Sequence, residues 1–80
     1  MNPYFLDDEE RTEVRSYTKS ELALLYSPGV KYESAIRMFN RYLHRCYGLM
    51  EALLRLGYSP YNRRFTRQQV AVVFDYLGEP

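Results

Sequence analysis

The residues best suited to chemistry in this sequence are basic. Three arginines and the only histidine fall between Ser34 and Met50, a stretch that holds no acid. Residues three or four positions apart share one face of a helix, so a helix here would gather its bases along one arc. Lys and Arg side chains on such an arc can contact nucleic-acid phosphates and some base edges. The candidate nucleic-acid-binding residues are Lys31, Arg37, Arg41, His44, Arg45, Arg63 and Arg64.

Catalytic and metal-binding groups are scarce. The only histidine, His44, stands among arginines, which favour its neutral form, and no nucleophile and base are paired. One histidine and one cysteine, Cys46, cannot supply a zinc site or an internal disulfide. Neither a Gly-rich phosphate loop nor a nucleophile elbow is found. We therefore expect no enzyme, no metal and no cofactor, with Cys46 a small buried hydrophobe and His44 a partly exposed helix residue.

Length and composition predict one small domain. The 80 residues are 46% hydrophobic and 26% charged, which are ordinary globular proportions. No apolar run approaches the roughly 18 residues of a membrane span, and no basic leader opens the chain, so we expect a cytoplasmic protein. Residues 1–13 carry a net charge of −4, whereas residues 14–80 carry +5. We predict a flexible acidic arm over residues 1–14 and a single helical domain over residues 15–80.

The elements that must position the bases are four short helices, and the prediction is a compact all-α bundle. Apolar periodicity and turn residues place these helices at about residues 19–26, 32–46, 49–56 and 67–77. The first and last helices each begin with a capping box, in which a threonine and the residue three positions later cap each other's backbone N–H groups. The predicted cap residues are Thr18 with Glu21 and Thr66 with Gln69.

The predicted helix 32–46 is amphipathic. Its apolar side should face the core, opposite the basic arc. Tyr32, Tyr42 and Tyr47 are expected in the core or at its boundary rather than as exposed stacking platforms. The residues of the apolar side are Ala35, Ile36, Phe39, Tyr42, Leu43 and Cys46.

One local pattern occurs twice in the chain. The segment from Tyr17 to Tyr26 aligns with the segment from Phe65 to Phe74, and every position is identical or similar in character. Either a unit was duplicated or two helices converged on one favourable cap and apolar face. Convergence is slightly favoured, because the residues that follow the two copies do not match.

The first two predicted helices resemble a helix-turn-helix, in which a short helix supports a second one that enters the major groove. Ala23 would stand at the close crossing point, and Gly29-Val30 would supply the turn. The fit requires Ser27-Pro28 to be a two-residue insertion in that turn. An arginine-rich face is also common on ordinary amphipathic helices, so the basic arc has a purely structural alternative explanation.

Several motifs together resemble a family of short bacterial proteins known as a domain of unknown function. The resemblance covers about residues 14–80 and implies continuity of the fold and a bacterial cytoplasmic location. It implies no catalytic or binding residues. The motifs are Arg15-Ser-Tyr-Thr-Lys-Ser-Glu-Leu-Ala-Leu-Leu-Tyr26, Leu49-Met50-Glu51, Leu56-Gly57-Tyr58, Phe65-Thr-Arg-Gln-Gln-Val70 and Tyr76-Leu77-Gly78-Glu79-Pro80.

The sequence thus favours a binding module, and two partners stay open. The first is DNA, bound in a regulatory or accessory role by a monomer or a homodimer. The alternative is a small protein–protein adaptor without nucleic-acid binding, which would expose an apolar patch around Tyr42, Tyr47, Tyr58 and Tyr61. A membrane partner is not expected.

Overall fold

A computed structural model describes residues 12–80, and within them the four predicted helices are all present. Two have the predicted bounds, and the other two end one residue earlier. Most of the predicted acidic arm, residues 1–14, lies outside the described residues. The elements in chain order are β1 (Tyr17–Thr18), α2 (Lys19–Tyr26), α3 (Tyr32–Arg45), α4 (Leu49–Arg55), β2 (Arg64–Phe65) and α5 (Arg67–Leu77).

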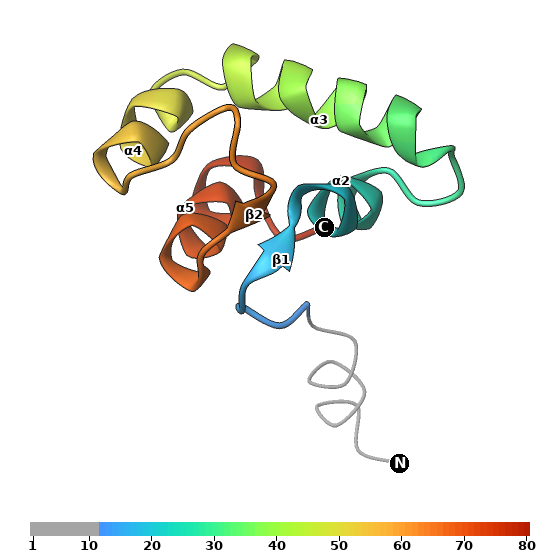
Figure 1. The fold of residues 1–80 in the computed structure, drawn as a ribbon, viewed down its shortest axis with the longest axis horizontal. Coiled ribbons are helices and arrows are strands. Elements are labelled where there is room, and N and C mark those ends of the chain that lie inside the picture. Colours follow the sequence, from blue (N-terminus) through green and yellow to red (C-terminus); the bar gives the residue numbers. More distant parts are fainter. Residues whose placement is uncertain (1–11) are drawn as a thin grey trace.

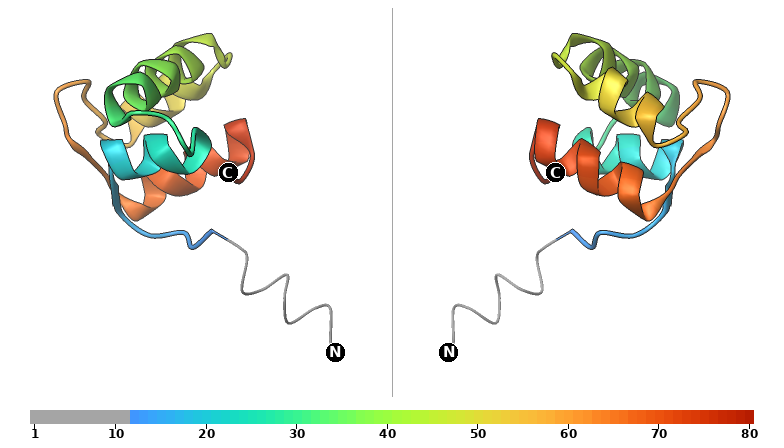
Figure 2. Two further views of the ribbon diagram at one scale, coloured as in Figure 1. Left: turned by 90° about the vertical axis from the view of Figure 1, so that its right-hand side faces the viewer. Right: turned by 90° about the vertical axis from the view of Figure 1, so that its left-hand side faces the viewer.

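The helices form two layers. Figure 1 shows α3 and α4 above α2 and α5, and the side views in Figure 2 show the same division. Figure 1 shows α3 along its length and α2 nearly end on, whereas Figure 2 shows α2 along its length, so these two helices cross rather than run side by side. In the described part of the chain, no helix is long and apolar enough to cross a membrane.

Both predicted capping boxes are confirmed. The Thr18 hydroxyl accepts from the Glu21 backbone N–H at 3.1 Å, and the Glu21 carboxylate accepts from the Thr18 N–H at 2.8 Å. The second box repeats this exchange between Thr66 and Gln69, at 3.2 and 3.0 Å. Each box satisfies backbone donors that the first turn of a helix leaves without an internal partner.

The prediction of an all-helical chain lacked one feature, a two-stranded antiparallel sheet of two residues per strand. Tyr17 of β1 stands opposite Phe65 of β2, and Thr18 stands opposite Arg64. The two copies of the internal repeat therefore begin side by side and pair with each other. Strands this short have no alternating pattern to reveal them, which is why sequence periodicity missed them.

The core lies between the two layers and is rich in aromatic rings. Phe39 of α3 stacks on Tyr26 with ring centroids 5.8 Å apart and meets Phe65 edge-on, also at 5.8 Å. The ring centroids of Tyr58 and Phe65 are 5.0 Å apart, and this contact joins the loop after α4 to the core. The Tyr26 hydroxyl donates to the Gly78 carbonyl and so holds the C-terminal segment against α2.

The turn between α2 and α3 spans residues 27–31. Gly29 has φ +83°, the left-handed conformation that glycine adopts without steric cost, as the predicted turn requires. Ala23 and Ala35 are both fully buried where the two helices pack, which permits a close approach of their backbones. The turn is nonetheless longer than the 3–4 residues usual in a helix-turn-helix, as the predicted insertion at Ser27-Pro28 implies.

Candidate nucleic-acid interface

The basic residues of α3 form a stripe along its outward side. Arg37, Arg41 and Arg45 are spaced four residues apart, His44 lies beside them, and all four side chains are exposed. We call these four residues the α3 basic stripe. Its three arginines are about 6 Å apart along the axis, slightly more than one helical turn.

Burial of the opposite side of α3 keeps the stripe in solvent. Ala35, Phe39 and Leu43 are buried, and Ile36 and Tyr42 pack against them. This confirms the predicted apolar face. Rotation of α3 about its axis would expose these side chains, so the core fixes the direction in which the arginines point.

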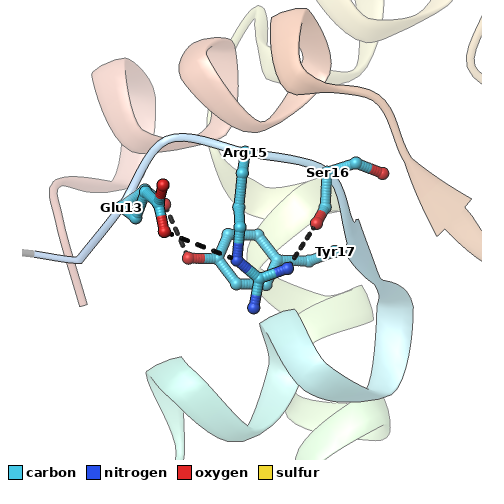
Figure 3. Close-up of polar contacts among 4 residues, drawn as sticks. All are labelled: Glu13, Arg15, Ser16 and Tyr17. Carbon is cyan, nitrogen blue, oxygen red and sulfur yellow. Dashed lines mark hydrogen bonds and ion pairs between the residues drawn. The ribbon is translucent and has the colours of Figure 1, made fainter.

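The stripe is free of ion pairs with the described acids. In residues 12–80 a single ion pair is found, between Arg15 and Glu13 at 3.8 Å (Figure 3). The Arg15 guanidinium also lies 4.0 Å from the centre of the Tyr17 ring, and the Tyr17 hydroxyl donates to the Glu13 carbonyl at 2.6 Å. Arg15 is thus engaged within the fold, whereas the stripe keeps its charge available.

A structural role for part of the stripe is also evident. His44 and Arg45 lie in the last turn of α3, where the helix dipole places partial negative charge. A cation there, such as Arg45, stabilises a helix by about 0.3–1 kcal/mol, and the same rule explains neither Arg37 nor Arg41. Arg37 and Arg41 are therefore the members of the stripe that best distinguish ligand binding from helix stabilisation.

Lys31 lies at the opposite end of α3. It is the N-cap residue, it is exposed, and its side chain makes no capping hydrogen bond. A helix of 14 residues is about 21 Å long, so Lys31 and Arg45 bracket an exposed face of that length.

The structure separates Arg63 from Arg64. The Arg64 Nε donates to the Ser16 hydroxyl at 3.0 Å, and its charge lies near enough to Glu21 to affect that carboxyl group. Hydrogen bonds from Thr18, chiefly, and the charges of Arg15 and Arg64 lower the pKa of Glu21. Arg63 instead lies on a groove, so the two arginines do not form one contact surface.

That groove has a volume of about 510 Å³ and lies between the start of α2, the start of α3 and the loop before β2. The Lys19 backbone N–H donates to the Arg63 carbonyl at 2.7 Å, which fixes the loop to α2. None of the described residues that line the groove is acidic. The lining residues that matter below are Lys19, Tyr32, Ile36, Pro60, Tyr61 and Arg63.

Comparison with known proteins places the chain in a family. A family model described as a domain of unknown function, DUF4248, matches residues 13–80. The chain belongs to the DUF4248 family. No curated protein and no solved structure was found to match it. The match confirms the resemblance inferred from the motifs, and the span of this DUF4248 domain coincides with the folded body.

Three of the sequence expectations for individual side chains need correction. Tyr47 was expected in the core or at its boundary, but it is 98% exposed, because it falls in the turn between α3 and α4. Tyr32 is 55% exposed, at the first position of α3, where its side chain lines the groove. Cys46 is only partly buried, and its thiol lies 3.7 Å from the Tyr76 carbonyl.

Two residues that line the groove, Tyr61 and Lys19, were absent from the basic residues predicted for binding, and Tyr61 was expected only in an apolar patch for a protein partner. Tyr61 is 93% exposed beside the groove, and burial lowers the pKa of Lys19. The groove joins three segments that lie far apart in the chain, so no spacing rule could have gathered its residues. Within residues 12–80, no cluster of three or more His, Cys, Asp or Glu side chains could hold a metal ion.

Proposed function

We propose that this DUF4248 domain binds DNA through the α3 basic stripe, in a regulatory or accessory role. The observation that carries the proposal is the row of exposed arginines at 37, 41 and 45, none of them paired with an acid of residues 12–80. Arginines on successive turns of one helix can contact successive phosphates along a groove edge. The exposed Lys31 adds a further cation at the start of α3.

The arrangement of α2 and α3 supports a helix-turn-helix-like mode of binding. The two helices cross closely, and α3 lies on the outside of the molecule, away from α5 (Figures 1 and 2). A major groove about 12 Å wide admits one helix of this kind. In this mode α2 supports α3, and the stripe residues face the DNA.

The test is fluorescence anisotropy with a labelled duplex at 50 and 200 mM salt. Neutralisation of about four phosphates predicts that the affinity falls roughly 100-fold over this range. Replacement of both Arg37 and Arg41 by alanine should weaken binding and flatten the salt dependence. Arg67→Ala is the matched control, because Arg67 is an exposed arginine on α5, outside the stripe.

The alternative function is a protein–protein adaptor. The tyrosine patch predicted for it is wrong at Tyr58, which is only 4% exposed and belongs to the core. The apolar side chains that favour a protein partner are instead Leu54, 52% exposed, and Leu56, 38% exposed, at the end of α4. Absence of duplex binding at both salt concentrations would contradict the DNA proposal and favour the adaptor.

A further inference from the structure

The loop before β2 displays an aromatic ring that the fold does not use. Residues 59–62 form a tight turn, in which the Asn62 N–H donates to the Ser59 carbonyl at 2.9 Å. Pro60 stands second in this turn, where its fixed φ is favourable, and Tyr61 follows at the tip. The Tyr61 side chain is 93% exposed, so it contributes almost no buried area to stability.

A second exposed ring lies on the α3 side of the same groove. Tyr32, at the first position of α3, is 55% exposed, and Ile36 follows one turn later. Ile36 and Pro60 add apolar surface to the groove. Its volume of about 510 Å³ lies within the range of 300–1,000 Å³ that is common for ligand sites.

The charge of the groove selects an anionic ligand. Lys19 and Arg63 both line it, and no acid does among the residues that the structure describes. The Lys19 Nζ lies 3.5 Å from the Tyr58 hydroxyl, which directs this side chain along the loop. Two cations beside two exposed rings and an apolar surface match a ligand that has both a flat ring and an anionic group.

We propose that this groove binds one unpaired nucleotide of single-stranded DNA. The base stacks on Tyr61, the more exposed of the two rings, and Arg63 and Lys19 contact the adjoining phosphate. Exposed aromatic rings interleaved with cations are the usual platform for single strands, because every base presents a flat face. An acidic peptide would satisfy the cations but would leave the rings without a stacking partner.

This inference rests on the proposed DNA-binding function, and it deepens it. The groove includes the first turn of α3, so both proposed DNA contacts involve the helix that carries the α3 basic stripe, although Ile36 of the groove lies on the opposite, apolar side of that helix. The protein would then prefer DNA that has an unpaired segment beside a duplex over an uninterrupted duplex.

The experiment compares a labelled single-stranded 12-mer with the duplex of the same sequence by anisotropy. Tyr61→Ala should weaken single-strand binding roughly 5- to 150-fold, the range found for removal of one aromatic stacking partner, and should leave duplex binding within about twofold. Tyr61→Phe should retain single-strand affinity, because stacking needs the ring and not the hydroxyl. Thermal unfolding of both variants should match that of the parent protein.

Tyr47→Ala is the matched control, since Tyr47 is equally exposed but does not line the groove. Equal single-strand affinities for the Tyr61→Ala and Tyr47→Ala proteins would overturn the groove assignment. If the duplex still binds through Arg37 and Arg41 in that case, the proposed function stands without it. If neither single strand nor duplex binds, the proposed function fails and the groove assignment fails with it.

Discussion

Tyr17 and Phe65 lie directly opposite each other in the β1–β2 pair, and each directly precedes a capping threonine and its helix. The two copies of the internal repeat are thus joined at their first residues, and each continues into a capping box. The capping boxes differ in the residue that caps the N-cap backbone, which is Glu21 in one copy and Gln69 in the other.

The two cap threonines should contribute similarly to stability. Thr18→Ala and Thr66→Ala should each lower the free energy of unfolding by about 1 kcal/mol, because each leaves a first-turn N–H without its acceptor. Urea denaturation at pH 7 measures both losses. Losses of less than a few tenths of a kcal/mol for both variants would show that the caps do not stabilise the helices.

Exchanging glutamate and glutamine at the third helix position should change stability differently in the two capping boxes. Gln69 is buried, and its Nε2 donates to the Leu56 carbonyl at 3.0 Å, a bond that a carboxylate cannot make. Gln69→Glu should therefore cost about 1–3 kcal/mol at pH 7, since it leaves a buried acceptor unsatisfied and sets a negative charge against it. Part of this loss should be recovered at pH 3, where the side chain is protonated. Equal stability of the Gln69→Glu variant and the parent protein would contradict this role for Gln69.

The converse variant, Glu21→Gln, should alter the pH dependence of stability. Hydrogen bonds from Thr18 lower the pKa of Glu21 in the folded state below its ordinary value. The ionised Glu21 carboxylate therefore contributes fully to folding stability above the unfolded-state pKa, and this contribution is lost as pH falls through the folded-state pKa. Between pH 7 and pH 3, the Glu21→Gln protein should lose less stability than the parent, as measured by urea unfolding at both pH values. An identical loss in the two proteins would show that this carboxylate is not linked to folding.

The α3 basic stripe should be dispensable for folding. Arg37→Ala and Arg41→Ala should each change the melting temperature little, because exposed charges contribute little to stability. Each should also reduce the slope of log affinity against log salt by about 1, if the side chain contacts a phosphate. Circular dichroism and anisotropy on the same samples separate the two effects. Unfolding of either variant would mean that the arginine supports the core and not a ligand.

The helical elements were predictable from the sequence because their signals are local. A cap threonine, a partner three residues later and an apolar period of 3.6 together define α2 and α5. The stripe on α3 was predictable for the same reason, since its spacing lies within one element. The exposure of Tyr47 was not predictable, because an apolar residue next to a helix end can face either way.

Features that depend on contacts between distant segments escaped sequence reasoning. The β1–β2 pair joins residues 48 positions apart, and the groove brings Lys19, Tyr32 and Tyr61 together. The separation of Arg63 from Arg64 follows from that pairing, because Arg64 lies in the strand and its side chain points away from the face that Phe65 buries. Such relations depend on tertiary packing.

The long-range pairing of Tyr17 with Phe65 has a consequence for biosynthesis. The first unit contains Tyr17 and α2, whereas the strand that pairs with it and the Phe65 ring, which meets Phe39 edge-on, are supplied only by residues 64–80. A nascent chain that ends before β2 lacks Phe65 and all of α5, so it cannot close this core. We therefore expect the domain to fold only after residues 64–80 have been synthesised, as one cooperative step.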